Sequence, residues 1–309
     1  MAKVSIIIPS RNEKYLAKTV EEAFSKARGK IEVIVVLDGP TSDPLPSPRP
    51  NLKLIKKSVP HGLRVAINMA AQKATGKYLL KTDAHCMFDI GYDLILQRDC
   101  QEDWVIVPRR HWMDSKKPRP WKVVPNKEPA DYHYLTFPWS SSGLSLNTAI
   151  WYQRCRERQD VNVDETMAIH GSMWFTNTDY FLDKLGGFDT KNFGYYAEHI
   201  EIILKTWLSG GRVMVNKNTW YAHLQDVTAV DRLWPEKLSD MKASHIRIAE
   251  YWVNNQWKKQ IHGFDWLIDK FWPLPLPGRH TTKDKHLWLD NWRDYYSKTP
   301  EEEIEKRWK

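Results

Sequence analysis

Short apolar runs alternate with longer helical patterns over the first part of the chain, and this alternation limits the folds that the chain can adopt. Residues 4–8 and 31–37 are almost wholly apolar and rich in β-branched side chains, which is typical of strands buried on both faces. A helix over residues 14–26 is predicted between them, because apolar residues recur on one face and Gly29 follows. These elements predict the start of an α/β fold.

The same alternation continues beyond the second apolar run. A short strand is predicted at residues 52–55, a helix begins after Gly62 and ends before Gly76, and a further strand begins at Tyr78. The resulting order, β-α-β-β-α-β, is typical of a mostly parallel sheet with helices on both faces.

The strand that begins at Tyr78 leads into Asp83, Ala84 and His85. Because side chains at positions i and i+2 of an extended chain share a face, Asp83 and His85 are expected to point at one site at the edge of the sheet. An oxygen and a nitrogen ligand suit a borderline divalent cation such as Mn2+, with phosphate and water completing the coordination. The alternative is that Asp83 caps a turn and His85 is an ordinary loop residue, and the triplet alone does not decide between them.

The composition indicates a globular protein without a cysteine framework. The 309 residues are 42% hydrophobic, which is enough for a core, and Cys86, Cys100 and Cys155 lack the spacing of a disulfide framework or a zinc site. The apolar run before Pro9 is too short for a signal peptide or a membrane anchor, and no stretch reaches about 18 uninterrupted apolar residues. We therefore expect a soluble protein with no membrane span, located in the cytoplasm; a chain trimmed of an anchor is the alternative.

Positive charge is concentrated in one segment of the chain. The formal net charge is +8, and residues 105–127 contain a single acid, Asp114, against a group of basic residues: Arg109, Arg110, Lys116, Lys117, Arg119, Lys122 and Lys127. Such a segment favours an anionic partner, whether a nucleotide diphosphate, a nucleic acid or an anionic glycan, although a solvated surface loop has the same composition.

Regular patterns fade over residues 109–164, where prolines, basic residues and aromatic residues accumulate. We interpret this segment as a long, ordered insertion with little regular structure of its own. The later elements are predicted to be helices over residues 179–185, 197–208 and 235–253 and a short strand at 213–215. The expected division is a catalytic domain over residues 1–227 and a helical, Trp-rich C-terminal extension over residues 228–309.

Six segments of the chain carry a family resemblance. In chain order they read SIIIPSRNE, VVLDGP, HGLRVAINMAAQKATGKYLLKTDAHC, LGGFD, AEHIEIILKTWLSGG and TWYAHL, and they extend from about residue 3 to residue 224. Together they resemble the GT-A glycosyltransferases of family 2, and especially the polypeptide N-acetylgalactosaminyltransferases, which carry Asp-x-His in place of the commoner Asp-x-Asp. The resemblance implies a GT-A fold, which is Rossmann-like with a mostly parallel central sheet flanked by helices.

The resemblance also implies a donor site around the Asp-Ala-His triplet. Asp83, His85 and His223 are its implied metal ligands, for Mn2+ or Mg2+, and the cation would stabilise the diphosphate of the leaving nucleotide. The implied donor-binding residues are Pro9, Ser10, Arg11, Asp38, Arg64, Asp83, Gly171 and Trp174. The alternatives are an exposed helix charge for Arg64, a core position for Trp174 and a buried structural histidine for His223.

The segment AEHIE supplies the candidate catalytic residues, Glu198 and His199. Glu198 and Glu201 share a helix face, and we expect Glu198 to point into the site and Glu201 to be structural. His199 stands where inverting family members carry the Asp that takes the acceptor proton and where the retaining ones carry Asn. Together with the Asp-Ala-His triplet this departure favours a retaining reaction, whereas an inverting one would use His199 or Glu198 as the base.

These observations predict a metal-dependent glycosyltransferase that moves a hexose or an N-acetylhexosamine from a UDP-sugar to an acceptor hydroxyl. Basic grooves with aromatic platforms bind nucleic-acid strands, so a hydroxymethylated pyrimidine in DNA is the acceptor hypothesis, with a glycan or a lipid-linked acceptor as the alternative. A nucleotidyltransferase is disfavoured, because residues 10–13 lack the glycine of a triphosphate-binding loop. A nucleic-acid-binding protein with a degenerate transferase fold is the alternative from another class.

Overall fold

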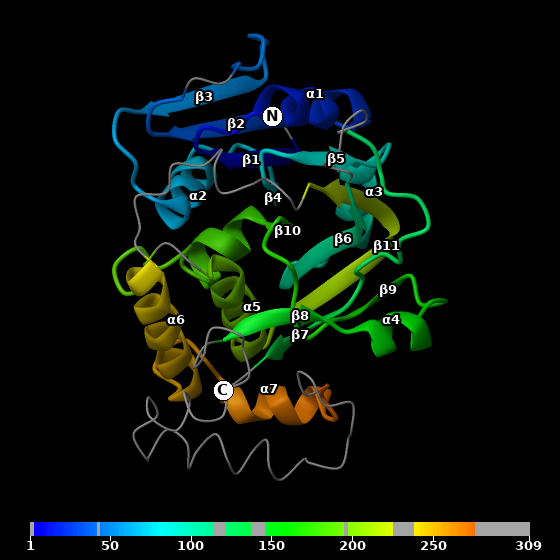
Figure 1. Ribbon diagram of the computed structural model, residues 1–309, viewed down its shortest axis with the longest axis vertical. Helices are drawn as coiled ribbons and strands as arrows, with labels where there is room; N and C mark the ends of the chain where they lie inside the picture. The colour runs from blue at the N-terminus through cyan, green and yellow to red at the C-terminus, as the bar shows by residue number, and fades with distance from the viewer. Residues whose placement is uncertain are drawn as a thin grey trace.

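The computed structural model describes residues 3–41, 44–113, 121–136, 146–194, 197–224 and 238–275. The strands of its central sheet are β1 (Val4–Ser10), β2 (Ile31–Asp38), β3 (Leu52–Lys57), β4 (Tyr78–Thr82), β5 (Cys86–Phe88), β6 (Trp104–Trp112), β9 (Val163–Glu165), β10 (Met173–Asn177) and β11 (Arg212–His223). They follow the order β3-β2-β1-β4-β10-β6-β11-β5, and β9 pairs with β11 (Figure 1).

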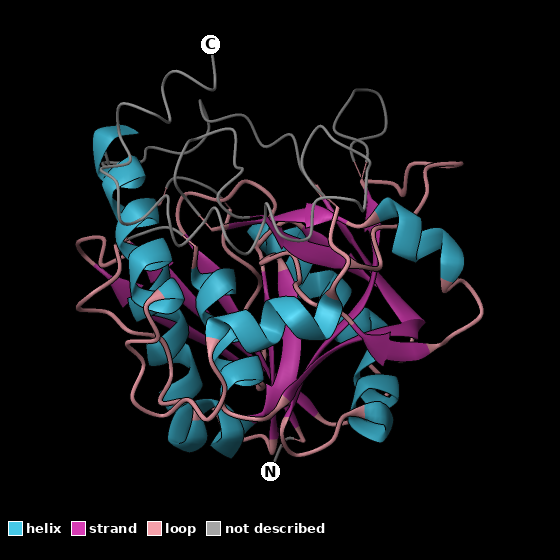
Figure 2. Ribbon diagram, turned by 90° about the horizontal axis from the view of Figure 1, so that it is seen from below, coloured by secondary structure: helices cyan, strands magenta, loops and turns pink. Residues whose placement is uncertain are grey.

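The N-terminal half of the sheet is wholly parallel. β1 pairs with β2 and with β4, and β2 pairs with β3. The crossovers pass through α1 (Leu16–Lys26), which packs on β2 and β5, and α2 (Leu63–Gln72), which packs on β1 and β2. Every residue of β2 is buried, because helices cover the sheet (Figure 2). The predicted β-α-β-β-α-β order is confirmed.

The other half of the sheet mixes both directions. β10 runs antiparallel between β4 and β6, and β5 and β9 are antiparallel to β11. The three longest ladders, β1/β2, β2/β3 and β6/β11, are all parallel. The predicted α/β class with a mostly parallel sheet is therefore confirmed.

β11 is longer than the predicted strand at residues 213–215. It continues to His223 through a shift of register between Asn216 and Trp220. Such an irregularity bends a strand and re-aims the residues that follow it. The polar residues around Asn216 therefore do not end the strand, and the strand carries His223 to the edge of the sheet.

The insertion over residues 109–164 contains more regular structure than predicted. β6 continues to Trp112, β7 (His133–Thr136) and β8 (Asn147–Ile150) form an antiparallel pair, and α4 (Tyr152–Glu157) follows. The prediction of little regular structure is wrong for the described residues of this segment. These elements are each too short to produce a readable hydrophobic period.

The remaining helices are α3 (Tyr92–Asp99), the π-helical turn η1 (Tyr180–Lys184), α5 (Glu198–Leu208), α6 (Leu238–Val253) and α7 (Phe264–Phe271). The α6 and α7 helices lie at the end of the molecule opposite β3 (Figure 1). Trp252 and Phe264 belong to the same buried apolar cluster as the sheet, and the ring centroids of Phe271 and Trp207 are 5.2 Å apart.

The predicted boundary at residue 227 falls among residues 225–237, which lie outside the described part of the chain. The division into a catalytic domain and an extension therefore stays a prediction. Among the described residues, no helix combines the length and the apolar character that a membrane crossing requires.

Candidate functional site

The ends of three strands meet where the Asp-Ala-His triplet lies. Asp83 directly follows β4, and its backbone N–H donates to the carbonyl oxygen of Ser172 at 2.8 Å. His85 directly precedes β5, and His223, the last residue of β11, lies opposite Cys86 in the β5/β11 ladder. The antiparallel pairing of β5 with β11 thus brings the two histidines together.

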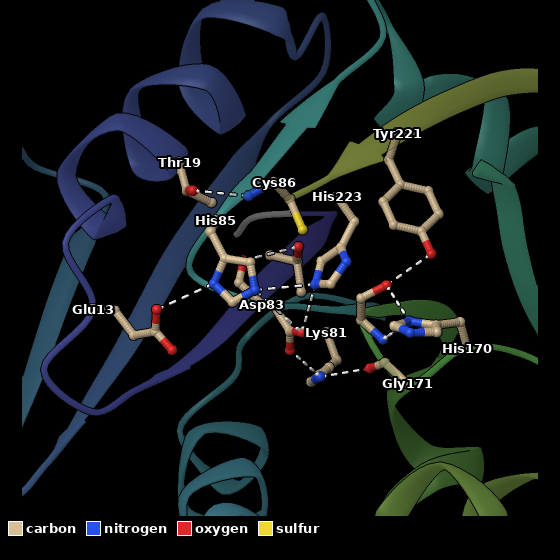
Figure 3. A network of polar contacts seen from close by, with 12 residues as sticks. Glu13, Thr19, Lys81, Asp83, His85, Cys86, His170, Gly171, Tyr221 and His223 are labelled. Atoms are coloured by element: carbon tan, nitrogen blue, oxygen red, sulfur yellow. Dashed lines mark hydrogen bonds and ion pairs between the residues drawn. The ribbon is translucent and has the colours of Figure 1, made fainter. Parts of the chain in front are cut away.

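Asp83, His85 and His223 form a cluster of potential metal ligands (Figure 3). The Nε2 atoms of the two histidines are 3.0 Å apart, and the Oδ2 atom of Asp83 lies 3.2 Å from Nε2 of His223 and 3.9 Å from Nε2 of His85. Ligand bonds of about 2.0–2.3 Å at right angles would place neighbouring ligand atoms about 3 Å apart. The three residues therefore fit a single divalent cation.

Glu13 orients one of the two histidines. Its Oε2 atom lies 3.1 Å from Nδ1 of His85, and both residues are buried. If Nδ1 carries the ring hydrogen and donates to this carboxylate, Nε2 keeps its lone pair and faces the cluster. A carboxylate behind a metal-binding histidine is the arrangement that fixes its tautomer and ring orientation.

The protonation states of the cluster also suit a cation. Burial lowers the pKa of His223 to about 3, so its ring is neutral at physiological pH. Burial raises the pKa of Asp83, but the charge of Lys81 and the hydrogen bond from His223 outweigh it and hold that pKa well below its usual value. A neutral imidazole and an ionised carboxylate are the forms that bind metals.

Lys81 is a buried cation next to the cluster. Its side chain is 1% exposed, and its Nζ atom donates to Oδ1 of Asp83 and to the carbonyl oxygen of Gly171, both at 2.6 Å (Figure 3). Burial lowers the pKa of Lys81, but the charges of Asp83 and Glu198 outweigh this and raise it above its ordinary value. Lys81 is therefore an ammonium ion.

A pocket opens beside the cluster. Its lining includes five of the predicted donor-binding residues, namely Pro9, Ser10, Arg11, Asp38 and Asp83. Asp83 is also a predicted metal ligand, and the predicted metal ligand His85 and the predicted catalytic residue Glu198 line the pocket as well. Asp38 also accepts hydrogen bonds from the backbone N–H groups of His61 and Gly62, at 2.7 and 2.8 Å. It thereby holds the loop that leads into α2 against the pocket.

Arg64 and Trp174 do not line this pocket. Arg64 is 3% exposed, and it donates to Oε2 of Glu201 at 2.9 Å and to the carbonyl oxygen of Gly194. The alternative of an exposed helix charge is therefore wrong. Trp174 is fully buried, with its ring centroid 5.3 Å from that of Phe181, so it occupies the core position that was the alternative. Donor binding by either residue stays a prediction.

Glu198, His199 and Gly171 meet at the start of α5. A Cβ atom on Gly171 would lie 2.8 Å from Oε1 of Glu198 and 3.1 Å from Cβ of His199, so a larger residue there would displace the carboxylate of Glu198. Glu198 lines the pocket, whereas Glu201 is fully buried and pairs with Arg64 and Lys205, in agreement with the expected placement of both acids. The catalytic roles of Glu198 and His199 stay predictions.

The sequence analysis did not single out several residues of this site. Lys81 interrupts an apolar strand, which is a readable signal, and Glu13 lies within the SRNE segment. A third histidine, His170, lies next to the cluster. Its ring centroid is 5.2 Å from that of His223, and its Nδ1 lies 2.8 Å from the hydroxyl oxygen of Ser172. Nothing in its local sequence marks His170.

Comparison with known proteins identifies the class. Residues 5–181 match the sequence model of glycosyl transferase family 2, and the chain belongs to this family. The expected family is thus confirmed. The assignment also supports the expected class of enzyme, a glycosyltransferase that depends on a nucleotide sugar.

The individual relatives are named as N-acetylgalactosaminyltransferases. The chain is 24% identical over 339 aligned residues to polypeptide N-acetylgalactosaminyltransferase 5 of Caenorhabditis elegans. The alignment covers 92% of this chain and 50% of that protein. It is 25% identical over 333 residues to the probable N-acetylgalactosaminyltransferase 6 of the same organism, with 96% and 50% covered. The chain thus spans about half the length of the curated relatives it matches.

A solved structure shares the fold. The crystal structure of GalNAc-T7 with UDP, GalNAc and Mn2+ superposes with a TM-score of 0.62 at 18% sequence identity, covering 82% of this chain and 49% of that chain. This likeness confirms the expected GT-A fold.

Proposed function

We propose that this protein is a metal-dependent glycosyltransferase that moves a hexose or an N-acetylhexosamine from a UDP-linked donor to an acceptor hydroxyl. The observation that carries the proposal is the convergence of Asp83, His85 and His223 beside a pocket at the strand ends. Ligands of such sheets bind beyond the carboxyl ends of the strands. The relatives named as N-acetylgalactosaminyltransferases, and the similar structure that contains UDP and Mn2+, support the same donor chemistry.

In this proposal the three ligands hold Mn2+ or Mg2+. A cation bound there would supply Lewis-acid stabilisation of the negative charge on the leaving diphosphate. Glu13 holds the ring of His85, and Lys81 adds a fixed positive charge behind Asp83. Pro9, Ser10, Arg11 and Asp38, on the same pocket, would bind the nucleoside part of the donor.

We propose a retaining reaction. The acceptor oxygen forms a bond to the anomeric carbon while the bond from that carbon to the diphosphate oxygen breaks, and the hydroxyl proton passes to the leaving diphosphate. The protein's own contribution is then to hold donor and acceptor in position. Glu198 reaches the pocket, so in the alternative inverting reaction it, or His199, would take the acceptor proton as the base.

The name of the first relative favours a polypeptide as the acceptor. The relatives' names give no support to the hypothesis of a DNA acceptor, and some of the basic and aromatic residues that suggested it contact other residues of the protein. Arg109 pairs with Asp131 at 2.7 Å, and Lys127 lies 3.6 Å from the ring centroid of Trp112. Trp252 and Trp257 are buried, so they offer no stacking platform.

The test is an assay of UDP release. The purified protein is incubated with Mn2+ and a panel of UDP-sugars, alone and with Ser/Thr-containing peptides, glycans or DNA with hydroxymethylated pyrimidines. We expect release that requires Mn2+, increases with one acceptor class and is abolished by Asp83→Asn. The anomeric configuration of the product then distinguishes retention from inversion. Absence of both UDP release and UDP binding would refute the proposal.

A further inference from the structure

Lys81 occupies a position where a charged side chain is costly. It lies in β4 between Leu80 and Thr82, all three buried, and its side chain is 1% exposed. Burying an ammonium ion costs several kcal/mol unless it is paired, and an apolar side chain of similar size often serves stability equally well. Stability alone therefore does not explain why a lysine occupies this position.

The two carboxylate oxygens of Asp83 face different partners: Oδ1 contacts Lys81, and Oδ2 faces the two histidines. Its Nζ atom lies 2.6 Å from Oδ1, whereas Oδ2 is the oxygen that approaches the Nε2 atoms of His223 and His85, at 3.2 and 3.9 Å. Binding of a cation through both oxygens would require this ion pair to open. Asp83 is thus arranged to offer one oxygen to the cation.

Lys81 also cancels the charge that Asp83 brings to the cluster. The other two ligands are imidazoles that bind metals in their neutral form, so the cluster and Lys81 together carry no net charge. Glu13 and Glu198 are the nearby acids: Glu13 contacts the far nitrogen of His85, and Glu198 lies on the pocket wall. Hard divalent cations prefer anionic oxygen ligands, which a diphosphate supplies.

We propose that Lys81 is a positioning residue that weakens the binding of a lone divalent cation and makes tight binding depend on the donor's diphosphate. This inference rests on the proposed function. Binding of the cation and binding of the nucleotide are then coupled, and each raises the affinity for the other by the same factor. Lys81 adds a second attraction for the diphosphate itself, because it carries a fixed positive charge behind the ligands.

The test is a titration of Mn2+ into the purified protein, with the free ion followed by electron paramagnetic resonance, in the absence and presence of UDP. For the wild type we expect at least tenfold tighter Mn2+ binding when UDP is present. Lys81→Met keeps the length of the side chain and removes the charge. We expect it to bind Mn2+ alone about tenfold more tightly than the wild type and to lose most of the gain from UDP.

The matched control is Lys81→Arg, which keeps the positive charge and should stay close to the wild type in both titrations. Lys81→Gln serves as a second neutral variant if Lys81→Met does not fold, as judged by circular dichroism. Damage to the fold alone would weaken Mn2+ binding, so tighter binding is a result that a purely structural role does not produce.

The outcomes separate the two proposals. A wild-type protein whose Mn2+ affinity rises with UDP, next to a neutral variant with unchanged or weaker binding of Mn2+ alone, would overturn the role of Lys81 and leave the proposed function standing. A wild-type protein that binds neither Mn2+ nor UDP would overturn both.

Discussion

The Nε2 atoms of His85 and His223 lie 3.0 Å apart, although 138 positions separate the two residues in the chain. The contact depends on the β5/β11 ladder, which places His223 opposite Cys86. Two buried ring nitrogens at this distance, next to a carboxylate, form a site that is already assembled in the fold. Replacing any one of the three ligands should therefore lower the affinity for the metal and leave the fold of the protein almost unchanged.

Removal of one ligand should strongly weaken metal binding. We expect His223→Ala to lower the affinity for Mn2+ by at least about 100-fold, measured by titration calorimetry in the presence of UDP, because two ligands remain where three are needed. The matched control is His262→Ala, whose ring stacks on Trp266 at 3.9 Å and lies outside the cluster. Equal Mn2+ affinity for the two variants would contradict the metal site.

Glu13 should tune the metal site without contacting the cation. We expect Glu13→Ala to lower Mn2+ affinity by about 10–100-fold, the usual cost of losing the partner of a metal-binding histidine. Glu13→Gln, which keeps an acceptor oxygen but not the charge, should fall between this variant and the wild type. Glu21→Gln is the control, since Glu21 belongs to an exposed ion pair with Arg49. Unchanged Mn2+ affinity in Glu13→Ala would show that the contact with His85 does not orient the ring.

A larger residue at Gly171 should displace the carboxylate of Glu198. In Gly171→Ala the new Cβ atom would lie 2.8 Å from Oε1 of Glu198, so Glu198 must move out of its position at the pocket. We expect UDP release in the presence of acceptor to fall at least tenfold, and the free energy of unfolding to fall by about 1–3 kcal/mol, the usual cost of overpacking. Mn2+ affinity should change little, because none of the three ligands is displaced. Full activity in this variant would show that the position of Glu198 does not matter for the reaction.

Protonation of Glu32 should lower the free energy of unfolding of the protein as the pH becomes acidic. Burial raises its pKa, but hydrogen bonds from Lys53, Ser5 and Thr75 outweigh this effect and lower it to about 2. Because the pKa is lower in the folded state than the unfolded value of 4.5, the stabilisation is complete above pH 4.5 and is lost as the pH falls towards 2.

We expect Glu32→Gln to reduce the free energy of unfolding by about 2 kcal/mol at pH 7, given about 1.4 kcal/mol for each pKa unit and partial replacement of the hydrogen bonds by Gln. Urea unfolding at pH 7, 5 and 3.5 should show the difference from the wild type narrowing only below pH 4.5. The control is Glu157→Gln, at an exposed residue of α4. A difference that stays constant over this pH range would contradict the lowered pKa.

The first half of the sheet was predictable, because its strands are long apolar runs between amphipathic helices. The continuation of β11 beyond residue 215 was not predictable, since its polar middle, around Asn216, resembles a loop and only the ladder with β6 shows that the strand continues. The insertion was misread for a similar reason. Its strands β7 and β8 have four residues each, and they are defined by pairing with each other rather than by a hydrophobic period.

Within the site, the spacing of Asp83 and His85 correctly indicated that they lie close together, but it did not decide between a metal site and a turn. The expected cause, an extended chain, differs from the structure, where residues 84 and 85 form a turn between β4 and β5. His223 required the family resemblance. Long-range contacts had no local signal: Glu13 meets His85 across 72 positions, and Arg64 meets Glu201 across 137. Arg64 does not line the pocket, although the family resemblance implied that it binds the donor.

The most direct test of the central claim is a calorimetric titration of UDP into the wild-type protein, with Mn2+ and then with EDTA, repeated with Asp83→Asn. If Asp83, His85 and His223 hold a cation that binds the donor's diphosphate, UDP should bind the wild type at least about tenfold more tightly with Mn2+ than with EDTA. The Asp83→Asn variant should show no such gain. UDP binding that is equal with Mn2+ and EDTA, or absent in both, would contradict a metal-dependent UDP-sugar transferase.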